Sequence, residues 1–204
     1  SAMIDAVEAG GLTFTGSFVG LGASLISEPS LSGDTYYDPE VFHKSHFSDG
    51  QYRVIVLNQT ESKNELYKTA DFSTFTLITD DLYPSQSTTE TVHTIQDHVV
   101  LPDGTFVIFC TDDPESNGDT AVFTGTDLED LTYVGLVKAS AVAIGSDCGA
   151  FLDPNGRTIH IYPEGTTKTG PTATTIEHYT VETSDLTDAT YVGTAIDVSA
   201  RSWN

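Results

Sequence analysis

Apolar and polar residues alternate along most of this chain, in short stretches that are rich in Val, Ile, Thr, Tyr and Phe. Alternation with a period of two places every second side chain on the same face of a β-strand. Clusters of Gly, Pro, Asp, Asn and Ser interrupt the stretches roughly every 8–12 residues, which is the spacing of short strands joined by turns. No segment has the period of an amphipathic helix, so the sequence predicts an all-β protein.

A short motif recurs along the chain and indicates a structural repeat. The segment LTYVG at residue 131 is closely similar to ATYVG at residue 189, and related segments begin at residues 12 and 73. The repeat is therefore about 58 residues long. Each unit also contains a turn pair, namely Asp49-Gly50, Asp103-Gly104 and Asn155-Gly156. We expect each pair to form a two-residue hairpin turn with positive φ at both positions.

Each repeat predicts four antiparallel strands, and a four-stranded unit repeated at this length is typical of a β-propeller blade. The predicted blades span residues 25–84, 85–140 and 141–199. Their strands lie near residues 40–46, 51–57, 64–70 and 74–79, then 97–101, 105–111, 119–126 and 131–137, and finally 148–152, 157–162, 174–183 and 189–196. A β-sandwich and a β-solenoid are the alternatives, and the regular recurrence of the turn pairs favours the propeller.

Three blades do not close a ring. Residues 4–24 predict the outer strand of a preceding blade, and residues 200–204 predict the start of a further blade or a tail. We therefore expect a propeller that is completed either by further blades or by a second copy of the chain in a homodimer. A closed monomer with shorter blades is the remaining interpretation.

The charge of the chain excludes two classes of partner. Thirty Asp and Glu residues face eight Lys and Arg residues, which gives a formal net charge of −22. Binding to nucleic acid or to an anionic membrane surface needs the opposite charge. The acids are scattered along the chain, so they predict a solvated, folded surface. Such a surface is typical of a protein from a high-salt organism or of an acidic secreted protein, and we expect an extracellular or cell-surface location.

The two cysteines give little information about function. Cys110 follows the apolar run Phe106–Phe109, and Cys148 precedes Gly149. Both are expected to be small buried apolar residues, although a disulfide between them stays open. Their spacing does not suggest a zinc site, and the sequence predicts no bound cofactor.

Several motifs resemble those of a known family of enzymes. The segment DPEVF at residues 38–42, followed by Asp49-Gly50, and the segments TSDL at 183–186 and GTDL at 125–128 carry the resemblance. They are similar to the blade motifs of the five-bladed β-propellers of the arabinanase, levansucrase and invertase superfamily, which includes glycoside hydrolase families 43 and 32. The resemblance implies a glycosidase-like propeller over about residues 25–199, and its motifs mark blade architecture more than chemistry.

Each predicted inner strand opens with an acid, and these acids are the candidate catalytic residues. Asp38, Asp97 and Asp147 would converge at one end of the central channel of a propeller. Closely spaced carboxylates raise one another's pKa, which separates a protonated acid from an ionised base or nucleophile as glycoside hydrolysis requires. The resemblance implies that Asp38 is the base or nucleophile and Asp97 the supporting acid. It places a Glu at the third position, where this chain has the shorter Asp147.

Other residues are expected near the same site. Tyr36 and Tyr37 precede Asp38 and are candidates for stacking on a sugar, as is Trp203. His98 follows Asp97 and is a further candidate for substrate binding; because adjacent strand residues point to opposite faces, a structural role is the alternative for this histidine. The three acids have two alternative roles. They could be structural, capping the starts of the inner strands or bonding to neighbouring blades, or they could hold a cation, in which case carboxylates, a histidine and waters suit Ca²⁺.

Two functions of different class are consistent with these features. One is a carbohydrate-active, glycoside-hydrolase-like domain, either active or catalytically inactive, that acts on or binds an oligo- or polysaccharide. The other is a non-enzymatic propeller module for binding, adhesion or assembly with a partner chain. A Glu beside Asp38 and Asp97 would favour the enzyme.

The charge also generates a prediction about stability. Self-repulsion of a net charge of −22 destabilises the compact state, and dissolved salt screens it. The melting temperature should therefore rise when NaCl or KCl is increased from low to molar concentration, as followed by circular dichroism. A flat or falling curve would contradict adaptation to high salt.

Overall fold

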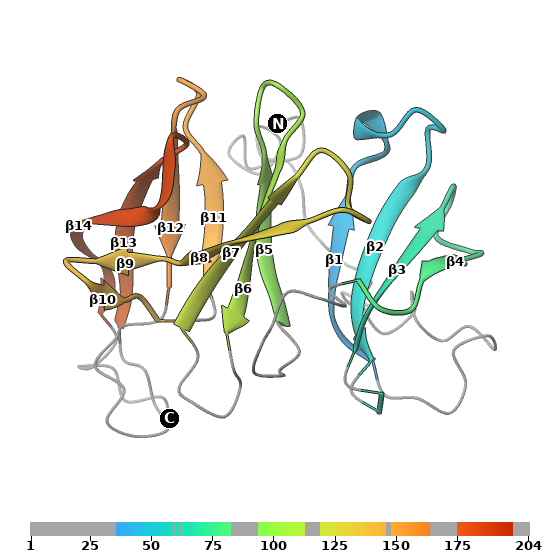
Figure 1. The fold of residues 1–204 in the computed structure, drawn as a ribbon, viewed down its shortest axis with the longest axis horizontal. Helices are drawn as coiled ribbons and strands as arrows, with labels where there is room; N and C mark the ends of the chain where they lie inside the picture. The colour runs from blue at the N-terminus through green and yellow to red at the C-terminus, as the bar shows by residue number, and fades with distance from the viewer. Residues whose placement is uncertain are drawn as a thin grey trace, which may run out of the picture. The chain divides into compact units, whose positions relative to one another are not determined.

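The computed structural model of this protein describes residues 36–58, 60–61, 63–82, 94–112, 119–145, 148–163 and 175–197, with the backbone alone at 36–38. All of them belong to the compact unit Asp34–Asn204. These residues form three β-sheets and one short 3₁₀ helix, so the predicted all-β fold is confirmed (Figure 1). No helix among them is long and apolar enough to cross a membrane.

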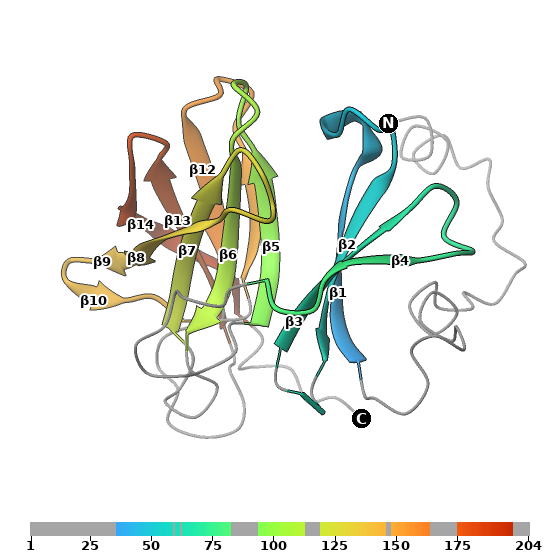
Figure 2. The ribbon, with the colours of Figure 1, turned by 45° about the vertical axis from the view of Figure 1, so that its right-hand side comes forward.

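The three sheets are formed by consecutive segments of the chain, and each contains a four-stranded meander (Figures 1 and 2). The first sheet contains β1 (Tyr36–Phe42), β2 (Tyr52–Asn58), β3 (Lys63–Thr69) and β4 (Thr76–Thr79), with the 3₁₀ helix η2 (Lys44–His46) between β1 and β2. The second contains β5 (Thr94–Val100), β6 (Phe106–Asp112), β7 (Asp119–Gly125) and β8 (Thr132–Leu136). The third contains β11 (Gly149–Leu152), β12 (Thr158–Tyr162), β13 (Thr175–Glu182) and β14 (Asp185–Asp197), and the hairpin β9 (Lys138–Ala139) and β10 (Val142–Ala143) extends it.

Each predicted strand has a counterpart in one of these sheets. The largest differences are at β1, which was expected at 40–46 and ends at Phe42, and at β14, which was expected at 189–196 and begins at Asp185. The blade boundaries stay a prediction. The segments 4–24 and 200–204, which were expected to belong to further blades, lie outside the described residues.

The turns that follow the inner strands have a different geometry from the expected one. Gly104 has a φ of 89°, whereas Asp103 is not among the residues with positive φ. Gly104 N–H donates to Leu101 O over 2.9 Å and Leu101 N–H donates to Thr105 O over 2.8 Å. This is a type I turn followed by a left-handed glycine, so the expectation of two positive φ values is wrong.

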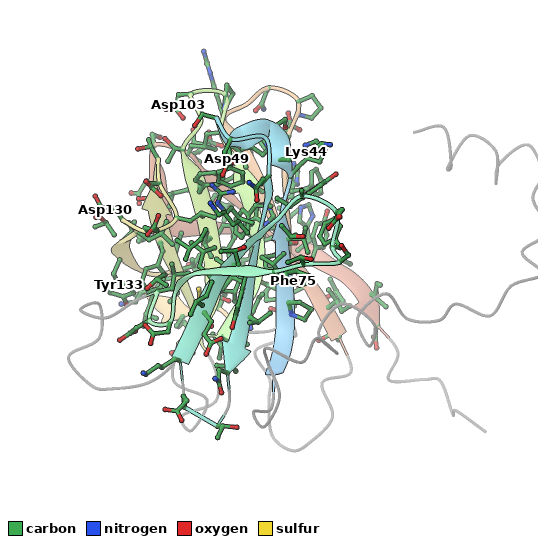
Figure 3. All side chains as sticks on the ribbon, turned by 90° about the vertical axis from the view of Figure 1, so that its right-hand side faces the viewer. Lys44, Asp49, Phe75, Asp103, Asp130 and Tyr133 are labelled. Atoms are coloured by element: carbon green, nitrogen blue, oxygen red, sulfur yellow. The ribbon has the colours of Figure 1, made fainter. Side chains whose placement is uncertain are left out.

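The side chain of the turn acid explains this geometry. Asp103 Oδ1 accepts a hydrogen bond from the backbone N–H two residues further on, at 2.9 Å. Asp49 and Asn155 do the same, at 3.1 Å and 2.7 Å. Such local bonds stabilise the right-handed conformation of the acid and leave only the glycine in the left-handed region. Figure 3 shows Asp49 and Asp103 in the turns that follow β1 and β5.

The second sheet is buried on both faces. Along β6, Val107 and Phe109 belong to one apolar cluster, which includes Ile159, Ile161 and Val181 of the third sheet. Phe106, Ile108 and Cys110 belong to another cluster, which includes Phe42, Ile55 and Leu66 of the first sheet. The second sheet therefore lies between the other two, and the uninterrupted apolar run of β6 is the sequence signal of this burial. Cys110 and Cys148 are buried thiols that form no disulfide, and their burial was expected.

The connection between the second and third sheets forms a hairpin that the sequence did not predict. Val137 N–H donates to Thr120 O of β7 over 2.8 Å, and Thr120 N–H donates to Ile144 O over 3.1 Å. Asp188 of β14 pairs with Lys138 of β9 in parallel. The hairpin thus joins β7 to β14 across the interface of the two sheets.

The turn of this hairpin generates a prediction. Ser140 and Ala141 have φ values of 51° and 68°, a pair that suits Asn-Gly better than Ser-Ala. A left-handed φ costs an ordinary residue roughly 1–2 kcal/mol. Glycine avoids this strain, but it loses more conformational entropy on folding, which cancels part of the gain. The double variant S140N/A141G should therefore be more stable by about 0.5–1 kcal/mol in urea denaturation. Glycine at the extended position Ala143 is the control and should destabilise; a loss of stability in the double variant would contradict the turn type.

The turn acid Asp103 generates a prediction about pH. The backbone N–H of Thr105, and then its hydroxyl, lower the pKa of this exposed carboxyl below 3.8. The stabilisation is therefore present above the ordinary pKa of Asp and is lost as the pH falls through the lowered value. Asp103→Asn keeps the acceptor oxygen and removes the charge, so the wild type should lose more stability than D103N when urea denaturation is repeated below pH 3.8. Equal losses of stability in the wild type and in D103N would contradict the lowered pKa of Asp103.

Candidate functional site

The first strands of the three sheets lie next to one another. The strand β5 contacts β1 on one side and β11 on the other. A pocket of about 510 Å³ opens where these strands meet. Its lining comes from all three strands and the residues beside them: Pro39, Glu40, Thr94, Ile95, Gln96, Cys148 and Gly149. The convergence of Asp38, Asp97 and Asp147 stays a prediction.

Three ionisable side chains gather beside this pocket. Glu40 of β1 and Asp97 and His98 of β5 place one ligand atom each within 4.8 Å of the others. His98 Nδ1 forms a hydrogen bond with Glu40 Oε1, and the two side chains are 16% and 20% exposed. The imidazole of His98 also lies against the ring of Phe42, with 4.0 Å between the centroids. The Glu40–His98 pair is thus held in a fixed place and stays within reach of solvent.

Two irregularities of the strands produce this cluster. The pairing of β1 with β2 shifts between Tyr37 and Glu40, and that of β5 with β6 shifts between Ile95 and Asp97. Such bulges change the direction of side chains and are common next to active sites. Beyond the bulge the strand is regular, since Asp97 pairs with Phe109 and His98 with Ile108. The two side chains accordingly bond in opposite directions, Asp97 to the third sheet and His98 to Glu40 of the first, as the sequence-based expectation of opposite faces has it.

The carboxylate of Asp97 joins two sheets. Its Oδ2 accepts the backbone N–H of Ala150 in β11 over 2.7 Å, and its Oδ1 accepts the N–H of His98 over 2.8 Å. The neighbouring Gln96 acts in the same way, since its Oε1 accepts the N–H of Cys148 over 3.0 Å. The bond to a neighbouring blade, which was one of the alternatives for the predicted acids, is therefore present at Asp97.

The other predicted site residues have different outcomes. Asp38, Tyr36 and Tyr37 lie on the backbone of β1, where the irregular pairing begins, and their side chains are outside the described part. Asp147 and Trp203 also lie outside the described residues. The catalytic and sugar-stacking roles of these residues stay predictions.

Sequence reasoning missed Glu40 and Gln96. Glu40 is the third residue of the motif at Asp38-Pro39, and regular alternation gave no reason to prefer it over Asp38. Gln96 precedes the candidate Asp97 directly. In both cases the signal was proximity to a predicted acid at the start of an inner strand.

The same cluster contains the groups that could hold a cation. Glu40 and Asp97 offer carboxylate oxygens, which Ca²⁺ prefers, and His98 offers a nitrogen. Both oxygens of Asp97 already accept backbone hydrogen bonds, and Glu40 bonds to His98, so a hard cation would compete with these bonds. The Ca²⁺ that the sequence left as an alternative therefore fits this donor set only in part, and we derive no step from it.

The fold is similar to that of several solved glycoside hydrolases. A thermostable family-43 glycoside hydrolase superposes with a TM-score of 0.57 at 14% identity, over 84% of this chain and 55% of that one. An exo-β-1,3-galactanase from Clostridium thermocellum gives 0.55 at 13% identity, over 87% of this chain and 39% of that one. A glycosyl hydrolase from Bacteroides ovatus gives 0.52 at 14% identity, over 78% and 49%.

These similarities concern the fold. No protein-family model matches the sequence, and no curated protein matches it either. This chain spans about half the length of the solved structures it matches. The three sheets are blades of the β-propeller fold of these glycoside hydrolases, so the resemblance that the sequence motifs indicated is confirmed at the level of the fold.

Proposed function

We propose that this chain is a carbohydrate-active, glycoside-hydrolase-like domain that binds an oligo- or polysaccharide at the pocket beside β1, β5 and β11. The observation that carries the proposal is Glu40, a carboxyl group that lines the pocket and lies next to Asp97. Glycoside hydrolysis uses two carboxyl groups at one site, and the solved structures of this fold are named as glycoside hydrolases.

The two carboxyl groups suit different roles. Asp97 accepts two backbone N–H bonds, so its place is fixed and it serves as a stationary negative charge. Glu40 bonds to His98, and a proton can move between a carboxyl and an imidazole that share a hydrogen bond. We therefore assign proton transfer to Glu40, positioning of Glu40 to His98, and charge stabilisation to Asp97. Asp38 and Asp147 remain our proposed partners in the same reaction, and Tyr36, Tyr37 and Trp203 our proposed sugar contacts.

The second candidate function is a non-enzymatic binding module. The observation in its favour is that both oxygens of Asp97 are occupied in bonds within the protein, one of them to the next sheet. In that case the pocket would bind a sugar without cleaving it. For either function we propose an extracellular or cell-surface location, and completion of the propeller by further blades or by a second copy of the chain.

Substitution of Glu40 tests the proposal. General acid–base catalysis contributes about 10²–10⁴ to the rate, so Glu40→Gln should lower the hydrolysis of aryl glycosides or oligosaccharides by at least about 100-fold at unchanged melting temperature. Glu129→Gln is the matched control, because Glu129 is an exposed acid of the loop between β7 and β8, and it should keep full activity.

The outcomes distinguish the two candidate functions. If the wild type cleaves no member of a broad glycan panel but binds a glycan on an array, and E40Q loses that binding, the binding module is supported. If the wild type neither cleaves nor binds any glycan, the proposed carbohydrate function is wrong. Equal activity of E40Q and the wild type would remove Glu40 from the reaction.

A further inference from the structure

One face of the third sheet points away from the second sheet and is partly open to solvent. Ile159, Ile161 and Val181 belong to the core that the third sheet shares with the second. Because side chains alternate along a strand, the residues between them lie on the opposite face. Phe151 and Ile196 lie on this opposite face, on the first and last strands of the meander, and are 46% and 51% exposed. We define the outer patch by six residues that span all four strands: Phe151, His160, Tyr162, Ile176, His178 and Ile196.

The outer patch is largely apolar, and its polar ring atoms bond within it. The rings of Phe151 and His160 stack with 4.5 Å between centroids, and those of Tyr162 and His178 with 4.7 Å. His160 Nδ1 and His178 Nε2 form a hydrogen bond over 2.8 Å. One nitrogen of each imidazole is thus satisfied inside the patch, which lowers the cost of burying both rings against a partner. Exposed surfaces that are rich in aromatic and apolar residues are typical of protein contacts.

The second sheet shows what covers the equivalent face within this chain. The hydrogen bonds that close the turns after β5 and β11 end at Thr105 and Thr158, which align the two sheets. Two residues further along, Val107 of the second sheet is the equivalent of His160 of the third. Val107 is fully buried in the core shared with the third sheet. A sheet therefore packs on this position of the fold wherever it is covered.

The other positions of the patch follow the same alignment. Their strand pairing matches, since Val99 pairs with Val107 as Phe151 pairs with His160. The equivalents of Phe151, Tyr162 and His178 are Val99, Phe109 and Val122, all buried in the same core. The outer patch thus continues the series of inter-sheet contacts that joins the first sheet to the second and the second to the third.

We propose that a second copy of this chain covers the outer patch. The equivalent positions that meet a sheet of the same chain are valines and a phenylalanine, at most 6% exposed. At the outer patch, imidazoles replace two valines, and Phe151 and Ile196 are about half exposed. Imidazoles and half-exposed rings suit a surface that is solvated in the free chain and buried on association, whereas a permanent neighbour favours aliphatic filling. A separate molecule therefore fits this face better than a covalently attached blade.

The second copy has two outer sheet faces, one on its first sheet and one on its third. Ile55 of β2 packs in the core shared with the second sheet, so its neighbours Val54 and Val56 lie on the outer face of the first sheet. These two valines are 5% and 2% exposed, so that face is already covered. The outer patch therefore pairs with the outer patch of the second copy around a two-fold axis, which is an isologous contact.

The net charge sets the salt dependence of this contact. Each chain has a formal net charge of −22, so two copies repel one another. None of the six residues of the outer patch is a carboxylate. Apolar burial thus drives the association, and dissolved salt screens the repulsion that opposes it. The dimer should become stronger as the salt concentration rises.

This inference rests on the proposed completion by a second copy and not on the carbohydrate function. Phe151 is not among the residues that line the pocket, so its replacement leaves the site of Glu40 and Asp97 intact. A measurement of molecular mass needs no glycan. Failure of the dimer and failure of the carbohydrate function are therefore separate results.

Analytical ultracentrifugation over a range of protein concentrations tests the contact. The wild type should form a reversible dimer that strengthens between about 0.1 M and about 1 M NaCl. Phe151→Lys places two like charges in the contact and should weaken the dimer at least about tenfold. Leu77→Lys is the matched control, because Leu77 of β4 is 49% exposed and lies outside the patch, and it should leave the dimer unchanged.

Three results would overturn the proposal. The first is a wild type that stays monomeric at its highest soluble concentration. The second is a dimer that is equally strong in F151K, and the third is a dimer that weakens as salt is added. A monomeric wild type whose F151K variant loses glycan binding would assign the patch to a sugar instead.

A measurement on the wild type keeps the test valid if F151K does not fold. Diethylpyrocarbonate modifies accessible histidines, and the modified residues are identified by mass spectrometry. Modification of His160 should fall as the protein concentration is raised through the dimerisation range, whereas the exposed His43 and His46 should react equally throughout. Equal modification of His160 at low and high protein concentration would contradict the contact.

Discussion

Burial of the second sheet on both faces is the constraint on which the rest of this structure depends. Alternate residues of β6 enter different cores: Val107 and Phe109 pack with the third sheet, and Ile108 and Cys110 with the first. Burial of one large apolar side chain stabilises a fold by roughly 1.5–3 kcal/mol. A strand that is buried on both faces buries about twice as many side chains as a strand with one exposed face, so it contributes correspondingly more to stability. This packing fixes the order of the sheets, and with it the neighbours of β5.

The candidate site follows from that order. Because β5 lies between β1 and β11, its polar residues can bond in both directions, His98 to Glu40 and Asp97 to the N–H of Ala150. The side-chain oxygens of Asp97 and Gln96 accept the backbone N–H groups of Ala150 and Cys148, at and just before the start of β11. The same bonds hold the carboxylate of Asp97 beside Glu40. Interface stability and site geometry therefore rest on the same residues.

The sequence predicted the strands well and the site in part. Period-two patterning and the apolar run at Phe106–Phe109 were sufficient for the sheets, and acids at inner-strand starts pointed to Asp97. The contact of His98 with Glu40 was not predictable, because it joins two strands of different sheets that are 58 residues apart in the sequence. The hairpin β9–β10 was missed because Ser140-Ala141 is not a recognisable turn pair, and tertiary packing holds its positive φ values. The turn acids were found, but their side-chain bonds changed the turn type.

Hydrogen exchange followed by mass spectrometry tests the central position of the second sheet most directly. Amides of a strand buried on both faces exchange only through global unfolding, whereas amides of exposed outer strands exchange through local opening. The account predicts that peptides covering β6 and β7 exchange slowest in the described part of the chain, and that peptides covering β4, with its two exposed residues, exchange much faster. Exchange of β6 at the rate of β4 would contradict the sandwiched sheet and the site that depends on it.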